Sequence, residues 1–225
     1  MTAKKKPARR EGEAKRDATR RLLLTRALAL FQNKGVEATT MRDIAKAAKL
    51  SLGAAYYYFP SKEALVFAYY EDNQAQLEHR ARPTGTLRER LGDLFHAKLE
   101  GIRPHRAMLA SIVSHLVNPG DPLSAFSSQT RSVRDRSLAL WTRELDGAVP
   151  SAAVPVVANA LWLLTLAAML VYINDDTPGE RRTHGLVDDG LDMVVPLLPL
   201  LGTPPGLALV QRITRSLDSA GIGLA

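Results

Sequence analysis

The sequence of 225 residues contains no cysteine, which excludes a disulfide framework and a thiolate metal site. Its N-terminus also lacks the apolar segment of a secretory signal peptide. Both features are typical of a cytosolic protein, and we expect a cytoplasmic location. The chain is long enough for one well-packed core and a small additional module.

The motifs of common enzyme classes are missing as well. The sequence has no glycine-rich phosphate loop, no nucleophile elbow and no pair of zinc-binding histidines at helical spacing. The five histidines are scattered, and the adjacent Asp188 and Asp189 would point in different directions on a helix. We therefore predict that the protein is not an enzyme and that it has no catalytic residue, metal site or cofactor.

Positive charge is concentrated in the first part of the chain. Residues 1–62 contain 15 Lys and Arg against 5 Asp and Glu, whereas residues 63–225 contain 15 against 18. The net charge of +7 therefore comes entirely from the first segment. A segment with this excess is the electrostatic signature of a surface that binds nucleic-acid phosphates.

The first fifteen residues are interpreted as a flexible basic arm. Five basic residues and Pro7 occur among the first ten without helical periodicity. Such an arm would add nonspecific attraction to phosphates, or reach into a minor groove. A solvated tail without a role is an equally good interpretation.

Two short helix signals lie close together between Met41 and Lys62. The first follows Thr40, whose hydroxyl would accept from the Asp43 amide while the Asp43 carboxylate reaches back, as in a capping box. The second begins at Ser51, a good N-cap residue, and runs into three consecutive tyrosines. Two such helices, joined by a tight turn, are typical of a helix-turn-helix, whose second helix enters the DNA major groove.

The second of these helices combines a small first turn with an aromatic end. Three adjacent tyrosines cannot all lie on one buried face, so some hydroxyls must meet water or phosphate oxygens. A half-buried aromatic helix in an ordinary bundle is the alternative interpretation. Ten residues are predicted to contact DNA: Thr40, Arg42, Ser51, Leu52, Gly53, Ala54, Tyr56, Tyr57, Tyr58 and Lys62. We expect bases to be contacted by Leu52, Gly53 and Ala54, with thymine methyl groups against Leu52 and Ala54.

The span from Arg16 to Leu65 resembles the DNA-binding domain of the TetR family of bacterial transcriptional regulators. The matching residues are Phe31, Gly35, Thr39, Thr40, Ile44, Ala45, Ala48, Ser51, Gly53, Tyr56, Phe59, Ser61, Lys62, Glu63 and Leu65. Two positions depart from the family pattern. Lys49 stands where the family has a turn glycine, so a left-handed backbone there would carry strain. Ala55 stands where a larger apolar residue is usual.

The rest of the chain reads as helices separated by proline- and glycine-rich turns, without an alternating strand pattern. We predict an all-α protein of about nine or ten helices, in which a three-helix helix-turn-helix domain precedes a helical ligand-binding and dimerisation domain. The expected parts are a basic arm (1–15), the DNA-binding domain (16–62), the helical body (63–201), and a linker with a tail (202–225). Helices are expected at about 16–34, 62–81, 87–102, 105–117, 123–145, 154–174, 178–198 and 207–217. A second capping box, formed by Thr177 and Glu180, would start the helix at 178.

Residues 156–173 carry no charge and are numerous enough to span a membrane. Against a membrane span, Trp162 lies in the middle of the segment, and Asp175 and Asp176 follow it at once. A helix that is apolar on all sides is equally expected at the centre of a bundle that packs against another subunit. We predict a buried interface helix and no membrane partner.

The resemblance to the TetR family implies the function of the helical body. It implies homodimerisation through the helices at about 154–174 and 178–198, binding to a palindromic operator in double-stranded DNA, and a small-molecule effector. We therefore expect a dimeric repressor that is released by a mostly apolar ligand. Candidate pocket residues are Met108, His115, Phe126, Trp141, Asn159, Trp162 and Met169. The alternatives are a DNA-binding regulator without an inducer, and a helical enzyme or membrane-associated interaction protein.

Overall fold

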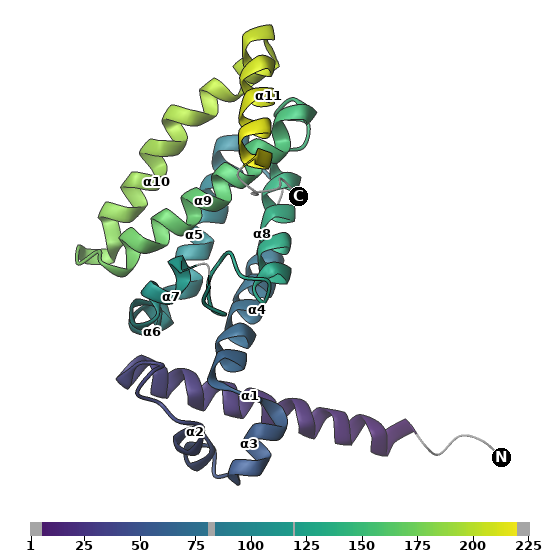
Figure 1. Cartoon of the computed structure of the whole chain (residues 1–225), viewed down its shortest axis with the longest axis vertical. Helices are drawn as coiled ribbons and strands as arrows, with labels where there is room; N and C mark the ends of the chain where they lie inside the picture. The colour runs from purple at the N-terminus through teal and green to yellow at the C-terminus, as the bar shows by residue number, and fades with distance from the viewer. Residues whose placement is uncertain (1–5, 81–83, 119, 220–225) are drawn as a thin grey trace, which may run out of the picture. The chain divides into compact units, whose positions relative to one another are not determined.

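The computed structural model describes residues 6–80, 84–118 and 120–219. Within these ranges the chain is helical and contains no β-strand, which confirms the all-α fold class. Figure 1 labels the helices in chain order.

The chain divides into two compact units that do not follow the order of the sequence. The first unit comprises residues 1–71 and 105–127, and the second comprises residues 72–104 and 128–225. The expected division into consecutive segments differs from this, because residues 105–127 from the middle of the chain join the N-terminal helices.

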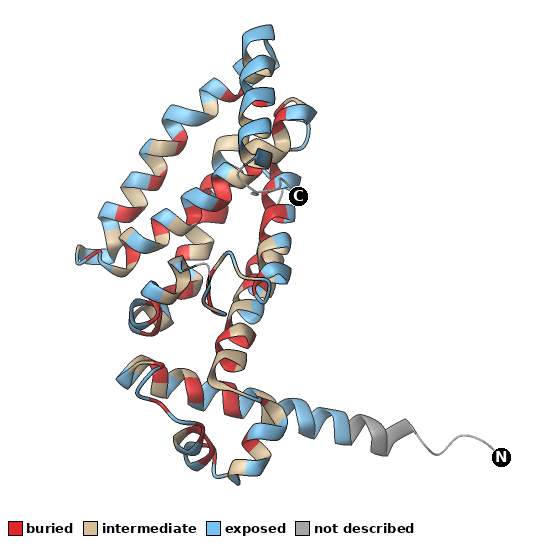
Figure 2. Cartoon of the chain, in the orientation of Figure 1, coloured by how far each residue is buried: buried red, intermediate tan, exposed pale blue. Residues whose placement is uncertain are grey.

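The first unit is built on four helices: α1 (Lys6–Lys34), α2 (Met41–Ala47), α3 (Leu52–Tyr58) and the first half of α4 (Lys62–Arg80). Apolar residues from all four are buried, as the red segments in Figure 2 show. Leu23, Ala27 and Phe31 recur every four residues, so they place one face of α1 inward. The other helices contribute Ile44, Ala45, Ala55, Phe59 and Leu65.

The predicted capping box at the start of α2 is confirmed. The Asp43 amide donates to Thr40 Oγ1 at 3.1 Å, and the Thr40 amide donates to Asp43 Oδ2 at 3.0 Å. Ser51 caps α3 through the Ala54 amide, at 3.1 Å. Lys49, in the turn between α2 and α3, has a φ of 56°, so the strain expected from a lysine at this position is present. Such a backbone costs a non-glycine residue about 1–2 kcal/mol.

Helix α1 begins earlier than the sequence suggested. Residues 6–15, expected to belong to a flexible arm, are helical, and only residues 1–5 of that arm lie outside the described residues. Alanine, glutamate, lysine and arginine in this stretch are good helix formers, and Pro7 is tolerated in a first turn.

Two short helices complete the first unit: α6 (Arg106–Ser111) and α7 (Val113–Val117), which follow a 3-10 turn (Arg103–His105). The prediction of one helix over 105–117 was wrong, because the backbone departs from helical geometry at Ile112, with φ −117° and ψ 10°. Helix α6 packs along α1, where the Met108 amide donates to Gln32 Oε1 at 3.1 Å.

The predicted helix over 123–145 is also shorter in the structure, where α8 spans Arg131–Leu145. The preceding residues form turns because side chains compete for their amides. The Leu123 amide donates to Asp121 Oδ1 at 2.8 Å, and the Phe126 amide donates to Ser124 Oγ at 3.2 Å.

The second unit contains the remaining helices: α5 (Leu87–Ile102), α8, α9 (Val154–Ile173), α10 (Arg181–Val194) and α11 (Pro204–Ser219), with 3-10 segments at Ser151–Ala153, Pro178–Glu180 and Val195–Gly202. Helices α5 and α9 match their predicted ranges to within one residue. In the core, the rings of Phe95 and Trp141 lie 4.7 Å apart between α5 and α8.

The C-terminal segment is more regular than expected. Residues 202–206 were predicted to be a linker, but α11 begins at Pro204, and Thr203 Oγ1 accepts from the Gly206 amide at 3.3 Å. Proline suits a first helical position because it needs no hydrogen-bonded amide there. Gly206 lies so close to the backbone of Leu200 and Leu201 that a Cβ atom would collide with them.

The start of α10 is held by a buried carboxylate. Asp175 is 1% exposed and accepts four hydrogen bonds, between 2.6 and 3.0 Å, from the amides and hydroxyls of Thr177 and Thr183. Burial acts to raise the pKa of Asp175, but these hydrogen bonds outweigh it and hold the pKa well below its usual range.

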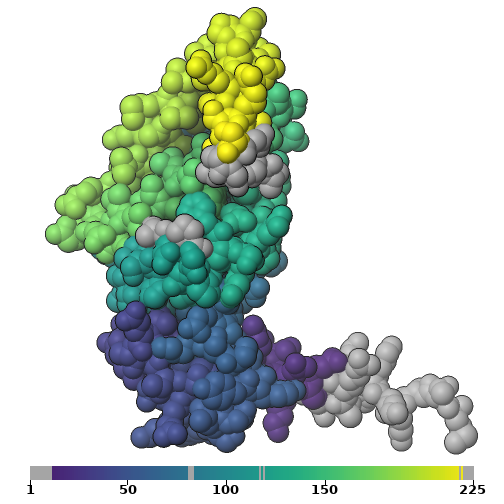
Figure 3. All heavy atoms as spheres, viewed as in Figure 1, coloured from purple at the N-terminus to yellow at the C-terminus, as the bar shows by residue number. Residues whose placement is uncertain are grey.

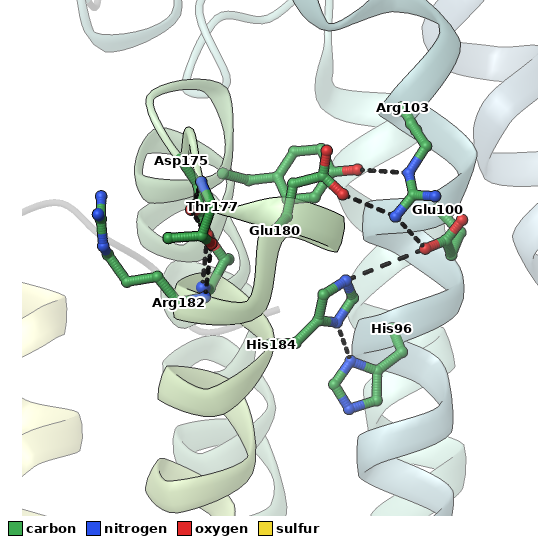
Figure 4. A network of polar contacts seen from close by, with 10 residues as sticks. His96, Glu100, Arg103, Asp175, Thr177, Glu180, Arg182 and His184 are labelled. Carbon is green, nitrogen blue, oxygen red and sulfur yellow. Dashed lines mark hydrogen bonds and ion pairs between the residues drawn. The ribbon is translucent and has the colours of Figure 1, made fainter.

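The capping box predicted from Thr177 and Glu180 was wrong for a backbone reason. Gly179 and Glu180 have φ values of 68° and 49°, so the chain makes a left-handed turn before α10. The Glu180 carboxylate instead accepts a hydrogen bond from Arg103 Nη2, at 2.7 Å (Figure 4). Next to this pair, His184 and His96 join α10 to α5, with their Nδ1 atoms 2.7 Å apart.

Helix α9 and the preceding turn, Ser151–Ile173, are long and apolar enough to cross a membrane, with a mean hydropathy of 2.2. The core helix of a soluble protein has the same composition, and α9 packs against α8 and α10.

Replacement of Asp175 by asparagine should destabilise the protein in a pH-dependent way. The folded-state pKa lies below that of the unfolded chain, so ionised Asp175 stabilises the native state above about pH 4, and this contribution is lost as the pH falls further. We expect Asp175→Asn to unfold at a lower temperature than the parent at pH 7, and the difference to shrink between about pH 5 and pH 2. Thermal unfolding followed by circular dichroism measures it.

Asp176→Asn is the matched control, because the Asp176 side chain is 86% exposed. This substitution should change neither the unfolding temperature at pH 7 nor its dependence on pH. A difference between Asp175→Asn and the parent that stays constant over this pH range would contradict the role of the ionised carboxylate.

Candidate DNA-binding interface

One face of helix α3 is buried and fixes the helix in place, and the opposite face is exposed to solvent. Ala55 is fully buried and Phe59, at the C-cap, is 2% exposed, so both anchor the helix to the core of the first unit. Ala55 is smaller than the usual residue of the TetR family, yet it is completely enclosed. On the opposite side Gly53, Tyr56 and Tyr57 are exposed.

The first turn of α3 leaves room for a partner at Gly53. A Cβ atom added there would meet nothing within 4 Å, so the fold leaves space for a methyl group at this exposed position. Leu52 and Ala54, the other predicted base-contacting residues, are half-buried beside it. Packing within the chain therefore does not require glycine at this position. Glycine would be required only by a molecule, such as DNA, that closely approaches the backbone of α3.

The three tyrosines point in different directions, as predicted from their adjacency. Tyr57 is 71% exposed, Tyr56 is 48% exposed and Tyr58 is half-buried. The rings of Tyr57 and Tyr58 meet edge to face, with centroids 5.2 Å apart. This contact orients Tyr57 outward, where its hydroxyl can donate to a phosphate oxygen.

Two arginines of α1 contact the aromatic end of α3, and the sequence analysis did not single them out. Arg16 lies over the ring of Tyr57, 6.0 Å from its centroid, and Arg20 lies over the ring of Phe59, at 4.9 Å. The two arginines are four residues apart, so they share one face of the helix. That spacing was a usable signal, because a helix was expected at about 16–34.

Thr40 and Ser51 are exposed at the N-termini of α2 and α3, but both hydroxyls accept hydrogen bonds within the chain. Thr40 Oγ1 also donates to Asp43 Oδ2, at 2.8 Å. The Asp43 carboxylate is bonded in turn by Lys34 Nζ at 2.8 Å, which, with the bonds from Thr40, holds its pKa well below the usual range. Arg42, next to this cluster, is exposed.

Lys62 has an internal role that the sequence did not reveal. Its ammonium group donates to the carbonyl oxygens of Val36 and Glu37, at 2.8 and 3.1 Å. Two of its three N–H groups are therefore used to tie the start of α4 to the loop that follows α1. At most one N–H group is left for the predicted phosphate contact, so we now expect that contact to contribute little to DNA binding.

Sequence and structure comparisons agree with this geometry. The family model for bacterial regulatory proteins of the tetR family matches residues 23–69, which include α2 and α3. The chain belongs to the TetR family of transcriptional regulators. TetR-family proteins are regulators rather than enzymes.

Individual relatives share mainly the N-terminal part. The chain is 49% identical to the transcriptional regulator YuxN of Bacillus subtilis over 55 residues, 23% of this chain and 19% of YuxN. It is 38% identical to the transcriptional repressor KstR2 of Mycobacterium tuberculosis over 98 residues, 39% of this chain and 46% of KstR2. The aligned part thus spans less than half of either relative.

The fold is shared over a longer stretch. A crystal structure of a TetR-family regulator from Streptomyces coelicolor is similar with a TM-score of 0.61 and 21% identity, over 91% of this chain and 98% of that one. The TetR-like fold therefore extends through the helical body.

The seven predicted pocket residues are not all in one unit. Met108, His115 and Phe126 belong to the first unit, where Met108 is fully buried and Phe126 is 46% exposed. The second unit holds Trp141, Asn159, Trp162 and Met169. Of these, Trp141 and Trp162 are buried, and Asn159 Nδ2 donates to Pro155 O on its own helix at 2.9 Å.

An open cavity of about 490 Å³ lies elsewhere in the second unit. Its lining is Ala152, Leu207, Val210, Gln211, Thr214 and Arg215. None of the seven predicted pocket residues contributes to it.

Lys62 and Arg42 should separate folding from phosphate binding. We expect Lys62→Met to lower the free energy of unfolding by about 1–2 kcal/mol, because two hydrogen bonds from a charged group are lost. The salt dependence of DNA binding should stay unchanged in this variant. Arg42→Met should leave stability unchanged and should reduce the slope of log K against log salt by about 0.9, the value for one phosphate contact.

Urea unfolding and DNA titrations at several salt concentrations measure both quantities. A reduced salt slope for Lys62→Met at unchanged stability would instead assign Lys62 to a phosphate.

Proposed function

We propose that the protein is a dimeric repressor that binds a palindromic operator in the cytoplasm and is released by a small, mostly apolar ligand. The observation that carries the proposal is the exposed face of α3, formed by Gly53, Tyr56 and Tyr57. A small first turn followed by outward tyrosine hydroxyls suits a helix that enters a major groove.

The ends of α3 would have different tasks in the complex. Leu52, Gly53 and Ala54 in the first turn face base edges, where the two methyl-bearing side chains favour thymine. Tyr57 and Tyr58, with Arg42 on α2, hold the phosphates on either side of the groove. The excess of basic residues in 1–62 attracts the duplex from a distance, and Arg16 adds charge directly beside Tyr57.

Exposed apolar stripes on α9 and α10 support dimerisation. On α9 the exposed residues Leu163, Leu164 and Leu170 recur at helical spacing. On α10 they are Leu186 and Met193, with exposed fractions of 53% and 67%, seven residues and about two turns apart. A second copy of the chain would cover both stripes, and its two-fold symmetry would present two α3 helices to two half-sites.

Two observations support a response to an effector. The helices bury apolar residues that suit an apolar ligand, and α6 contacts α1, so a shift of α6 would move α1. To shift the DNA-bound fraction from 99% to 1%, a ligand must prefer the released state by about 5.5 kcal/mol. A similar protein, KstR2, is named a repressor, which supports the sign of regulation. A regulator without an inducer would bind the same operator, and no small molecule would release it.

Larger side chains at Gly53 test the role of α3. Because a Cβ atom there meets nothing in the chain, Gly53→Ala and Gly53→Leu should fold with unchanged or slightly raised stability. We expect Gly53→Ala to weaken operator binding by about tenfold and Gly53→Leu by at least about a hundredfold, since clashes of a few kcal/mol arise only against DNA. Fluorescence anisotropy with a labelled operator measures the affinity.

Equal operator affinity of the parent and Gly53→Leu would refute insertion of this turn into the groove. Thermal unfolding of both variants provides the folding control.

A charge within the α10 stripe tests the dimer. Leu186→Glu should produce a monomer, because a carboxylate would have to be desolvated in an apolar interface. Loss of the second α3 should weaken operator binding by about a hundredfold or more. Gln211→Glu places the same carboxylate on an exposed position of α11 and should remain dimeric. Sedimentation analysis decides the matter: a dimeric Leu186→Glu protein would exclude this stripe from the interface.

A further inference from the structure

Two buried polar atoms lack a hydrogen-bond partner among the described residues: the Tyr70 hydroxyl oxygen and His105 Nδ1. Unpaired buried polar groups are rare, because each has lost its bonds to water without replacement. Two of them in one region therefore indicate a partner that is not part of the chain.

The two groups belong to neighbouring parts of the first unit. Tyr70 lies on α4, and His105 immediately precedes α6. Tyr69 contacts both of their rings: its centroid lies 5.0 Å from that of His105, edge to face, and 6.0 Å from that of Tyr70. The rings of Tyr70 and His105 thus contact the same aromatic side chain.

Most of the buried side chains on α4 and in the segment that follows His105 are apolar. Val66 on α4 is fully buried, and so are Met108 and Ile112, while Leu109 is 1% exposed. A molecule that reaches the two polar atoms must therefore be mostly apolar itself.

Both groups are neutral near pH 7. Burial raises the pKa of Tyr70, with smaller contributions from Tyr69 and from the charge of Asp121. Burial lowers the pKa of His105. Asp121 is the charged residue that acts on Tyr70, and its carboxylate is already paired with His115 at 2.6 Å. Among the described residues, the one charge that acts on Tyr70 is thus already compensated, so the Tyr70 hydroxyl favours a neutral ligand.

We propose that the Tyr70 hydroxyl and His105 Nδ1 form the polar anchor of an effector site, and that they bind the oxygen of a neutral hydroxyl or carbonyl group on a mostly apolar molecule. The inference rests on the proposed response to a ligand and specifies the chemistry of that ligand. A hydroxyl group can donate to one atom and accept from the other, and a carbonyl oxygen can accept from both when His105 carries its proton on Nδ1.

The anchor lies next to contacts through which a bound ligand would change the positions of α1 and α2. Next to His105, α6 is bonded to the end of α1 through Met108 and Gln32. On the next helix, α7, His115 Nε2 lies 3.2 Å from Oε1 of Glu37, a residue in the loop that leads to α2. A ligand that repositions α6 would act on both contacts within the first unit.

The first experiment tests whether the Tyr70 hydroxyl is unpaired in the free protein. Tyr70→Phe removes a group without a partner and should unfold at the same or a higher temperature than the parent. Tyr172→Phe is the matched control: Tyr172 is also fully buried, but its hydroxyl accepts from Arg103 Nε at 3.3 Å. Its loss should lower the melting temperature by about 2–4 °C.

The second experiment tests the chemistry of the ligand with four probes of one shape: naphthalene, 2-naphthol, 2-acetylnaphthalene and 2-naphthoate. Isothermal titration of the full chain should show both neutral oxygen-bearing probes binding about tenfold more tightly than naphthalene, the effect of one or two hydrogen bonds. The anionic 2-naphthoate should bind most weakly. Tyr70→Phe and His105→Phe should each reduce the preference for 2-naphthol over naphthalene severalfold and leave naphthalene unaffected.

Three results would overturn the inference: a loss of stability in Tyr70→Phe equal to that in Tyr172→Phe, equal affinity of the parent for naphthalene and 2-naphthol, or no binding of any probe. Operator release separates this inference from the proposed function. If 2-naphthol binds as expected but the affinity for DNA is unchanged, the anchor stands and the ligand-responsive repressor fails. If another molecule releases the operator equally well from Tyr70→Phe, the repressor stands and the anchor fails.

Discussion

The structure of the first unit depends on the hydrogen bonds made at the end of α1. Lys62, from the start of α4, donates to the carbonyl oxygens of Val36 and Glu37. The Met108 amide donates to Gln32, and His115 lies against Glu37. Residues 32–37, at the end of α1 and in its loop, thus bind three side chains or amides that lie 26, 76 and 78 positions further along the chain. That loop leads directly into the capping box of α2, so the orientation of α3 is tied to α4 and α6.

Sequence signals predicted the structure correctly where the interactions involve residues close together in the chain. The bond between a cap hydroxyl and an amide three residues later involves only a few neighbouring residues, and Thr40 and Ser51 both form it as predicted. Thr177 and Glu180 show the same pattern and fail. There the Gly179 turn is left-handed and Glu180 is engaged by Arg103, 77 residues away, which no local pattern contains.

The exposed face of α3 was predictable for the same reason, whereas the internal contacts of Lys62 were not. The exposed face of α3 follows from helical geometry over a few residues, so Tyr56 and Tyr57 lie outward as expected. Lys62 was expected to bind phosphates because it follows the helix, but its distant partners Val36 and Glu37 decide where its charge lies. The pocket residues were chosen as central apolar side chains, and the packing distributes them over two units.

The cluster around Asp175 has a consequence for the order of folding. Its four hydrogen bonds join residues only two and eight positions apart, so closing them costs little chain entropy. The start of α10 can therefore become structured while most of the polypeptide is still unfolded. The bond between Gln32 and Met108 instead closes a loop of 76 residues and must come later. In a full-length chain that refolds, the turn before α10 should thus form early and the contact of α6 with α1 later.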